Sequence, residues 1–459
     1  MTRARVDFAI VGGGIAGLWM HAALRQHGFS CVLIESNALG SGQTLASQGI
    51  VHGGLKYALN AKLNEASESA AAMPARWRAL LADARGPTLQ HGPSGLQGLP
   101  ALSDAYYLFA TAGLADRLVS FLASRSLQGR ALRLQAHDYP GWLAEPGFSG
   151  PVYRLDDFVI DTHALLQRLA DTDSISGANV GAQHPRHNQA AARLLHAHVY
   201  GIRAAATHVQ LQLHMQLPPD LLRRAGHNID VDVEVDAQRL LLCAGAGNAE
   251  LLNLAQRAAP AMQLRPLHQV WLRRAPNEHN DAQRADMPSA FAHCLSGVRS
   301  NEPRLTITTH AGTTHAGTTP TGTTHPHSRG SVWSLGGALA TQGVHRTRQQ
   351  QIEFARAELA ACVPWLPTAN LQFATALIER AEPHTPTGTR PDHAYVHYDN
   401  GVFTCWPTKL TLAPDLADRV IALIQAQQLR PRADADMDSL AQCPRPALSA
   451  PAWEQLTWN

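Results

Sequence analysis

A glycine-rich turn near the start of the chain is the feature that most constrains its fold. A short apolar run, Val6–Val11, leads directly into Gly12-Gly13-Gly14-Ile15-Ala16-Gly17. The following stretch, to Gln26, is rich in Ala, Leu and Met and predicts a helix that stops at Gly28. Ser30–Glu35 then reads as a second strand that ends in an acid. The order of buried strand, glycine turn, helix and strand predicts a dinucleotide-binding unit on a parallel sheet.

The spacing of the glycines and of the acid within this unit predicts a role for each in binding a dinucleotide. Gly12 permits the tight turn, Gly14 lets the backbone approach a pyrophosphate, and Gly17 allows the helix to pack closely on the sheet. The helix N-terminus offers free N–H donors to the anion. Glu35 follows Gly17 by 18 residues, where its carboxylate accepts the ribose hydroxyls and disfavours a 2′-phosphate. The motif argues against NADP but does not separate NAD from FAD, and a turn that has lost its ligand is the remaining alternative.

The loop after the second strand separates these cofactors. Ala9–Leu18 (AIVGGGIAGL), Val32–Ser36 (VLIES) and Gly40–Tyr57 (GSGQTLASQGIVHGGLKY) together resemble the D-amino-acid-oxidase superfamily of flavoproteins. Within it they are most similar to FAD-dependent glycerol-3-phosphate dehydrogenase and L-2-hydroxyglutarate dehydrogenase. The former carry a Ser-rich loop that ends in His-Gly-Gly-Leu-Arg-Tyr, which His52–Tyr57 nearly reproduces, with Lys56 in place of Arg. The latter carry Gln-Thr, then Ser-Gly, then His, and the segment from Gln43 to His52 is similar to that pattern.

Later segments resemble other parts of the same superfamily. Ala244-Gly245-Ala246-Gly247 resembles its second glycine turn, and Arg265–Leu272 resembles the opening of its main substrate-domain segment, with His268 where the family has Gly. The Gly-x-Arg-Pro of glycerol-3-phosphate dehydrogenases corresponds to Gly388–Pro391. Their Gly-Gly-Lys-x-Thr-Thr corresponds to the segment that ends Lys409-Leu410-Thr411, with Trp406-Pro407 replacing the glycines.

The resemblance implies an α/β protein, α+β overall. A Rossmann-like FAD-binding domain of βαβ type, discontinuous in the chain, is combined with a substrate domain that contains an antiparallel sheet. The expected segments are 1–80, 150–258 and 376–430 for the FAD-binding domain, 81–149 and 259–375 for the substrate domain, and 431–459 for a C-terminal surface tail. Residues 309–330 repeat His-Ala-Gly-Thr-Thr without apolar periodicity and predict a disordered low-complexity loop. Because its histidines have no ordered scaffold or acid partner, no metal site is expected there.

The resemblance also implies FAD, bound non-covalently, and a set of residues around it. The expected cofactor-binding residues are Gly12, Gly14, Ile15, Ala16, Gly17, Glu35, Ser36, Gln43, Thr44, Ser47, Gln48, Gly49, Ala244, Gly245, Thr408, Lys409, Leu410 and Thr411. The expected catalytic residues are His52, Arg390 and Lys409, and the expected substrate contacts are Lys56, Tyr57 and Arg390.

Three of these residues have chemistry suited to an oxidation. An imidazole takes up a proton near neutral pH, so His52 is the candidate general base; the alternative is a histidine that only hydrogen-bonds the flavin or its own loop. The planar fork of Arg390 suits a carboxylate or phosphate, and a surface salt bridge is its alternative. Lys409, beside a helix N-terminus, would stabilise the anionic reduced flavin.

The expected function is that of an FAD-dependent oxidoreductase, a dehydrogenase or oxidase. It would oxidise a small polar metabolite at a carbon bearing a hydroxyl, such as a 2-hydroxy acid or glycerol phosphate, by hydride transfer to flavin. A D-amino-acid or sarcosine-type amine oxidase is the first alternative, and a non-catalytic flavin-binding redox partner is the second. The electron acceptor stays open between oxygen, a quinone and a redox protein.

Composition excludes other classes of function. The 38 Lys and Arg residues nearly balance the 36 Asp and Glu residues, so the sequence lacks the basic excess of a nucleic-acid-binding protein. The six cysteines form no CxxC pair, so no disulfide framework is indicated. No apolar run approaches the roughly 18 residues of a membrane span, and the N-terminus has no signal region. We therefore expect a cytoplasmic protein, with peripheral contact to a membrane left open.

Overall fold

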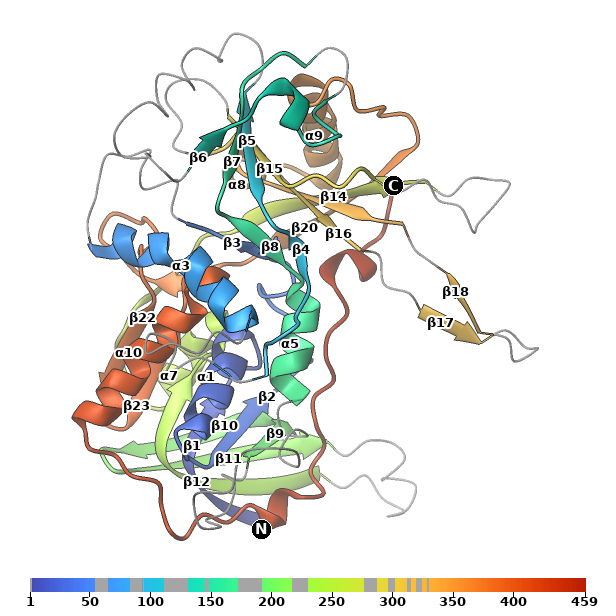
Figure 1. Ribbon diagram of the computed structural model, residues 1–459. Coiled ribbons are helices and arrows are strands. Elements are labelled where there is room, and N and C mark those ends of the chain that lie inside the picture. The colour runs from blue at the N-terminus through green and yellow to red at the C-terminus, as the bar shows by residue number, and fades with distance from the viewer. Residues whose placement is uncertain are drawn as a thin grey trace.

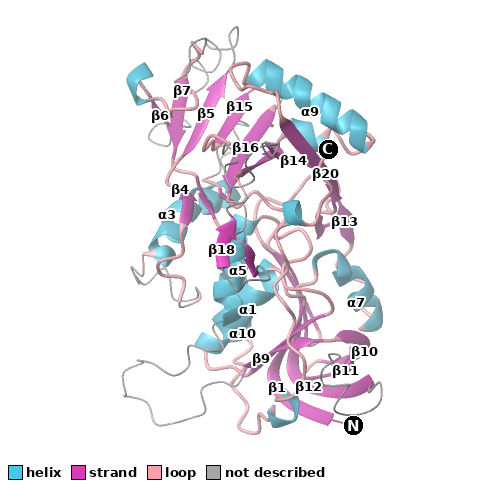
Figure 2. Ribbon diagram, turned by 90° about the vertical axis from the view of Figure 1, so that its right-hand side faces the viewer, coloured by secondary structure: helices cyan, strands magenta, loops and turns pink. Residues whose placement is uncertain are grey.

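The computed structural model of the chain describes residues 2–53, 65–82, 93, 95–110, 131–144, 148–171, 192–216, 230–275, 287–295, 302–311, 315–318, 324–327 and 330–459. Within them, two large sheets lie one above the other (Figure 1). The chain begins at the lower sheet and ends beside the upper one (Figures 1 and 2). A Rossmann-like layer below a largely antiparallel sheet confirms the predicted fold class.

The lower sheet is built around the apolar strand that precedes the glycine turn. Its strands are, in order, β10 (His198–Ala205), β11 (His208–Gln216), β12 (Asp230–Leu242), β1 (Thr2–Val11), β2 (Cys31–Glu35) and β9 (Ala192–His196), with β23 (Val402–Trp406) on β12 and β22 (Tyr395–Asp399) on β23. β1 pairs in parallel with both β2 and β12, and β23 pairs in parallel with the end of β12. The carboxyl ends of these four strands therefore meet at one edge of the sheet, where ligands bind in such folds.

Helices cover both faces of this sheet. On one face lie α1 (Ile15–Gln26), α3 (Glu65–Leu81), α5 (Thr162–Asp171) and α10 (Ala413–Ala426), and on the other lies α7 (Asn248–Leu254). Phe8 and Ile10 of β1 pack toward α1, whereas Ala9 and Val11 pack toward the opposite core, as the two-residue period of a strand requires. This burial on both faces is what the continuous apolar run predicts.

The upper sheet is antiparallel except for one pair. Its strands are, in order, β20 (Leu371–Ile378), β14 (Leu267–Arg274), β19 (Val332–Gly336), β16 (Leu305–His310), β15 (Ala292–Leu295), β5 (Tyr106–Ala110), β7 (Val152–Leu155) and β6 (Ala131–Arg133). β15 and β5 pair in parallel. The helices α8 (Ala338–Thr341) and α9 (Arg348–Cys362) cover one face, and α9 begins with a capping box formed by Thr347 and Gln350.

Three small sheets complete the description. β3 (Ile50–Val51), β8 (Phe158–Ile160) and β4 (Ala101–Ser103) form one, with β8 in the middle. β13 (Met262–Leu264) pairs with β21 (Ala381–Pro383), and β17 (His315–Thr318) pairs with β18 (Thr324–His327). In the chain, β3 directly follows the glycine-rich loop after β2, so its pairing with β8 fixes where that loop ends.

Three parts of the chain lie differently from the expectation, namely β7, the start of the low-complexity loop and the C-terminal segment. β7 falls within the segment 150–258 assigned to the FAD-binding domain, yet it pairs with β5 and β6 of the upper sheet. Thr309 and His310 were placed at the start of the low-complexity loop, but both are buried in β16. His310 Nε2 lies 2.9 Å from Thr308 Oγ1, and its ring packs against Trp453. The repeat hides the end of this strand, because its Thr and His residues resemble the loop that follows.

The C-terminal segment, predicted as a surface tail, runs along both sheets (Figure 1). It exchanges backbone hydrogen bonds with the lower sheet between Asp436 and Arg5, at 2.7 and 2.9 Å. At the other end, Asn459 exchanges backbone hydrogen bonds of 3.1 and 3.0 Å with Phe373 of β20. Met437 and Leu440 are buried against the lower sheet. The segment is therefore a packed strap across the two layers.

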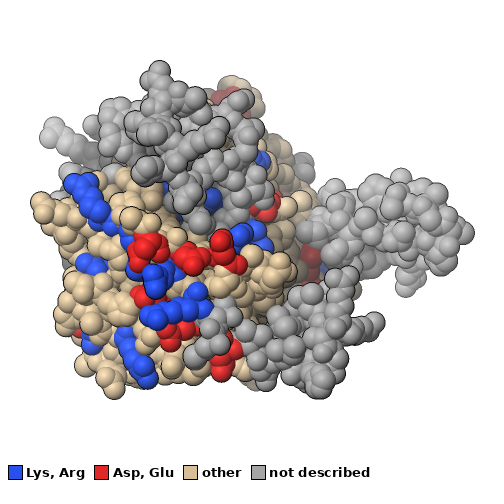
Figure 3. All heavy atoms as spheres, turned by 90° about the horizontal axis from the view of Figure 1, so that it is seen from below, with Lys and Arg blue, Asp and Glu red and all other residues tan. Residues whose placement is uncertain are grey.

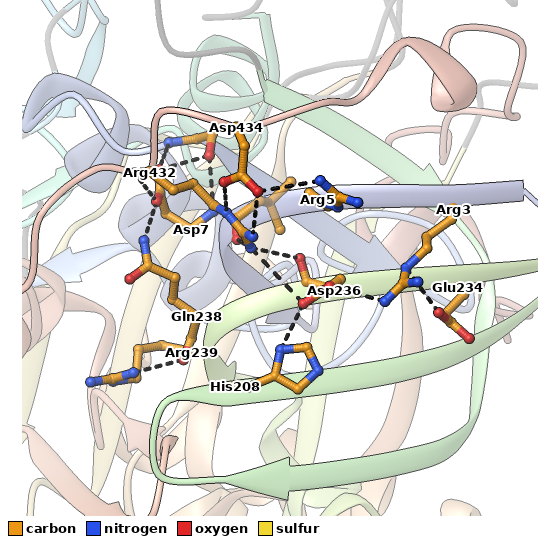
Figure 4. A network of polar contacts seen from close by, with 12 residues as sticks. Arg3, Arg5, Asp7, His208, Glu234, Asp236, Gln238, Arg239, Arg432 and Asp434 are labelled. Atoms are coloured by element: carbon orange, nitrogen blue, oxygen red, sulfur yellow. Dashed lines mark hydrogen bonds and ion pairs between the residues drawn. The ribbon is translucent and has the colours of Figure 1, made fainter.

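Asp7, at the bottom of the lower sheet, anchors the start of this strap (Figure 4). It is 1% exposed, and its two carboxylate oxygens accept hydrogen bonds from Ser30, Gln238 and the backbone N–H of Arg432. The Arg432 side chain in turn pairs with Asp434 at 2.8 Å. Such a fully hydrogen-bonded carboxylate is tolerated inside a core.

The lower face mixes charges of both signs. Viewed from below, Lys and Arg side chains lie next to Asp and Glu side chains (Figure 3), and Arg3, for example, pairs with both Glu234 and Asp236. None of the helices that the structure describes is long and apolar enough to cross a membrane.

Candidate active site

A cavity of about 700 Å³ opens at the carboxyl edge of the lower sheet. Residues from the ends of β1, β2, β12 and β23 line it, together with Leu267 and Gln269 of β14 and residues 377–381 at the end of β20. The cavity therefore lies between the two layers, where the parallel strands end.

The first glycine turn forms one wall because no larger residue fits. Gly12 has φ +111°, and a Cβ there would lie 2.6 Å from the backbone of Ala244. A Cβ on Gly17 would lie 1.8 Å from the carbonyl oxygen of Gly12. The N-cap of α1 is Gly14, which has no side chain to cap the helix, and Gly14, Ile15 and Ala16 line the cavity, so this helix start is suited to an anion.

Glu35 is held at the edge of this wall by backbone donors. The Gly13 N–H donates to Glu35 Oε2 at 2.6 Å, and the Asn37 N–H donates to Oε1 at 2.8 Å. Both Glu35 and Ser36 line the cavity. Each carboxylate oxygen keeps a second lone pair, which suits a pair of ribose hydroxyls.

The loop from Gly40 to Gly49 crosses the cavity and is tied to both layers. Thr44 Oγ1 accepts the N–H of Ile15 at 3.2 Å. Gln48 lines the cavity but uses Nε2 to donate to the carbonyl oxygen of Ser334 in β19 at 2.9 Å. The buried Ser47 hydroxyl has no hydrogen-bond partner among the described residues, and it also lines the cavity.

The second glycine turn and the end of β23 form the opposite wall. Trp406, in place of a family glycine, is 1% exposed, and its Nε1 donates to the carbonyl oxygen of Gly245 at 3.1 Å. Buried Asn248 joins the same parts, because its Oδ1 accepts the N–H of Ala244 and its Nδ2 donates to the carbonyl oxygen of Cys405. Thr408 has φ +60°, a strained conformation for a β-branched residue.

His52 follows β3 and also lines the cavity. Its Nδ1 lies 3.5 Å from Oδ2 of Asp157, a carboxylate whose Oδ1 accepts the N–H of Gly53 at 2.7 Å. The His52 side chain is 37% exposed and that of Asp157 is 6% exposed. His293 of β15 stacks parallel to His52 with ring centroids 6.2 Å apart. Burial, and then the charge of His52, lowers the pKa of His293 to about 3, so this second ring is neutral at neutral pH.

Three cations line the same cavity: Arg380, Arg390 and Lys409. Arg380 Nε donates to the carbonyl oxygen of Arg265 at 3.0 Å. Burial, and then the charges of Arg390 and Arg265, lowers the pKa of Arg380 to about 10. Glu382 is buried nearby and pairs with Arg265 at 3.3 Å. Positive charges that oppose one another in a cavity favour the binding of an anion.

The structure brings together most residues expected from the sequence. All the expected cofactor-binding and catalytic residues line the cavity except Gly17 and Thr411. Gly17 acts through close packing on Gly12, and Thr411 is buried with its carbonyl oxygen bonded to Trp77 Nε1. Lys56 and Tyr57 lie outside the described residues.

Sequence reasoning missed Asp157, Asn248 and Arg380. Asp157 stands in the turn Leu155-Asp156-Asp157-Phe158, where an acid between two buried strands was a usable signal. Arg380 stands at the end of β20, ten residues before the arginine that the family motif contains. Asn248 directly follows the second glycine turn.

The residues present fit FAD. The start of α1 suits a pyrophosphate, the anchored Glu35 suits a ribose, and the Ser47 hydroxyl, which has no partner among the described residues, suits a further polar group of the same ligand. Comparisons with known proteins agree. The model of the family described as FAD dependent oxidoreductase (DAO) matches residues 7–406.

Relatives of known structure resemble the whole chain. The probable FAD-dependent oxidoreductase PA4991 of Pseudomonas aeruginosa is 40% identical over 98% of this chain and 97% of its own length. Its crystal structure superposes with a TM-score of 0.70 and 35% identity over 99% of each chain. Glycine oxidase from Geobacillus kaustophilus has a TM-score of 0.57 at 16% identity, over 95% of this chain and 97% of its own. The FAD-bound L-alpha-glycerophosphate oxidase of Mycoplasma pneumoniae has a TM-score of 0.58 at 12% identity, over 94% and 97%. The last two show the shared fold alone, whereas the family match and PA4991 show that this chain belongs to the FAD-dependent oxidoreductases of the DAO family.

Proposed function

We propose that this enzyme oxidises a small anionic metabolite at a carbon bearing a hydroxyl, such as a 2-hydroxy acid or a glycerol phosphate. The observation that carries the proposal is that a histidine backed by a carboxylate, His52, lines the same cavity as Arg380 and Arg390. Bound FAD supplies the hydride acceptor. The protein must then supply a base for the hydroxyl proton and a counter-charge for the substrate anion.

His52 meets the first requirement. Hydride loss from a neutral alcohol would leave a protonated carbonyl, a very strong acid, so the reaction needs a base that takes the O–H proton. As the C–H electron pair leaves as hydride, the O–H bond breaks and its proton moves to the imidazole, which leaves a carbonyl compound. A neutral amine instead gives an iminium ion, which its nitrogen lone pair stabilises. An amine can be oxidised from its neutral form without such a base. A carboxylate-backed histidine therefore favours the hydroxyl substrate.

Arg390 and Arg380 meet the second requirement. A guanidinium binds a carboxylate or a phosphate through two parallel hydrogen bonds, which fixes both position and orientation. Lys409 precedes the turn into α10 and lines the cavity. A cation beside a helix N-terminus stabilises negative charge that develops during the reaction. We assign Arg390 and Arg380 to the substrate anion and Lys409 to the developing charge.

The protein with FAD bound tests this proposal under anaerobic conditions. A panel of 2-hydroxy acids, polyol phosphates and D- and L-amino acids is mixed with it, and bleaching of the flavin absorbance is followed. We expect at least one anionic hydroxyl compound to reduce the flavin. Reduction by amino acids alone would favour an amine oxidase, and no reduction by any compound would favour a redox partner without turnover. Oxygen, a quinone analogue and a redox dye, added to the reduced protein, identify the class of electron acceptor.

A further inference from the structure

We propose that Asp157 is a positioning residue for His52: it holds the proton on Nδ1, so that Nε2 is the basic nitrogen offered to the substrate. The inference rests on the proposed function, because it explains how His52 serves as the base. Three observations carry it, namely strand register, the fixed carboxylate and the character of the neighbouring histidine.

Strand register brings the two residues together. β3 and β8 pair antiparallel, with Ile50 opposite Val159 and Val51 opposite Phe158. The next pair in that register is His52 and Asp157. Directly opposite residues of an antiparallel pair have adjacent side chains. The pairing of β3 with β8 therefore places the Asp157 carboxylate beside the His52 imidazole.

The carboxylate itself is held in place. Asp157 Oδ1 accepts the N–H of Gly53 at 2.7 Å, which leaves Oδ2 facing His52 Nδ1 at 3.5 Å. This distance is longer than the usual N–H···O separation of about 2.9 Å, and such contacts often tighten when a substrate binds. Because a carboxylate only accepts hydrogen bonds, the Nδ1 that faces it must carry the proton in the neutral ring.

The second histidine does not compete for this carboxylate. His293 Nδ1 lies 3.0 Å from Thr306 Oγ1. The His293 ring also packs on the Tyr106 ring, with the two ring centroids 4.6 Å apart. Burial and the charge of His52 keep the pKa of His293 low, at about 3. The Tyr106 hydroxyl donates to the carbonyl oxygen of Ile307 at 2.7 Å, and burial, with the charge of Asp157, raises its pKa well above the usual value. The His293 ring and the Tyr106 hydroxyl are therefore uncharged at neutral pH, and Asp157 is the carboxylate that lies against the His52 imidazole.

Nitrogen NMR of the FAD-loaded protein, labelled with ¹⁵N-histidine, tests the inference without any substrate. The His52 signals are identified by their loss in His52→Gln. We expect wild-type His52, in its neutral form, to carry its proton on Nδ1, and Asp157→Asn to shift the population toward the Nε2–H form. Asp156→Asn is the matched control, because Asp156 is an exposed acid in the same turn. An Nε2–H tautomer in the wild type would overturn the inference, and that observation needs no variant to fold.

A double-mutant cycle tests the same inference by kinetics, with the fastest-reducing compound of the panel. We expect Asp157→Asn to slow flavin reduction about 10- to 100-fold, a part of the roughly 10²–10⁴-fold that a positioned general base supplies, with little change in KM. In the His52→Gln background the same substitution should change the rate less than about 3-fold, because its effect passes through His52. An equal loss in both backgrounds would assign Asp157 a structural role instead. If no compound reduces the flavin, the proposed function fails while the NMR result still decides the tautomer.

Discussion

The cavity is lined by two sets of residues that work in different ways. The cofactor set, represented by Gly12, Glu35 and Gly245, acts through backbone shape and backbone hydrogen bonds. The proposed substrate set consists of His52, Arg380 and Arg390, which line the same cavity and whose side chains would supply charge and a base. The first set fits the FAD that the family match implies. The choice of substrate belongs to the second set, and the two sets can be separated by substitution.

The largest effect should come from the base. We expect His52→Gln to lower the rate of flavin reduction by about 10²–10⁴-fold, the usual contribution of a general base, while the dissociation constant for FAD stays within about 3-fold of wild type. Stopped-flow absorbance measures the rate, and titration of the apoprotein with FAD measures the affinity. A variant that loses FAD as well would place His52 in the cofactor set.

A substitution in the cofactor set should weaken FAD binding, which His52→Gln should leave unchanged. Gly17→Ala places a Cβ 1.8 Å from the carbonyl oxygen of Gly12, so α1 must shift. We expect it to lower the free energy of unfolding by about 3 kcal/mol and to weaken FAD binding. Gly42→Ala is the matched control, because a Cβ on this cavity-lining glycine meets nothing within 4 Å. Equal stability of the two variants in urea would contradict the close packing at Gly17.

The arginines should affect binding more than chemistry. We expect Arg390→Leu to raise KM about 10- to 100-fold, as the loss of a charge-assisted hydrogen bond of about 1.5–3 kcal/mol implies. Arg380→Leu should act in the same direction, and Arg380→Lys should restore part of the affinity because it keeps the charge. Steady-state kinetics with the best substrate measure both constants. A fall in kcat with unchanged KM would argue against substrate binding by these residues.

The smallest expected change is in the free energy of unfolding, and it concerns His21, a buried histidine of the lower layer. Neither ring nitrogen of His21 has a partner among the described residues, and burial lowers its pKa to about 3. Burial likewise lowers the pKa of His310 to about 4. Because the folded state binds these protons less readily than the unfolded chain, their stabilising contribution is complete above about pH 6.5 and is lost as pH falls through that value toward 4.

We therefore expect His21→Leu to raise the free energy of unfolding by about 1 kcal/mol at pH 7 and to flatten its decline in acid. Urea titrations between about pH 7 and 4.5, where histidines protonate in the unfolded chain, measure both quantities. His137→Leu is the control, because that side chain is 80% exposed. A decline in acid that is the same for both variants would show that His21 is not among its causes.

The difference between the two sets also explains what the sequence could predict. Gly12, Gly17 and Glu35 lie within one βαβ unit, so their spacing alone predicts where they meet. Asp157 meets His52 only because β8 pairs with β3 from more than a hundred residues away, and no local pattern contains that register. The same holds for the C-terminal strap, since its Pro- and Asp-rich composition hides the backbone pairing of Asn459 with Phe373.

Anaerobic flavin reduction tests whether His52 is the base for oxidation of a hydroxyl substrate. Its rate is measured for wild type and His52→Gln with an anionic hydroxyl compound and with an amino acid. We expect the hydroxyl compound to reduce the wild-type flavin and His52→Gln to slow this step by about 10²-fold or more. Reduction by the amino acid alone, at a rate that His52→Gln leaves unchanged, would contradict this expectation.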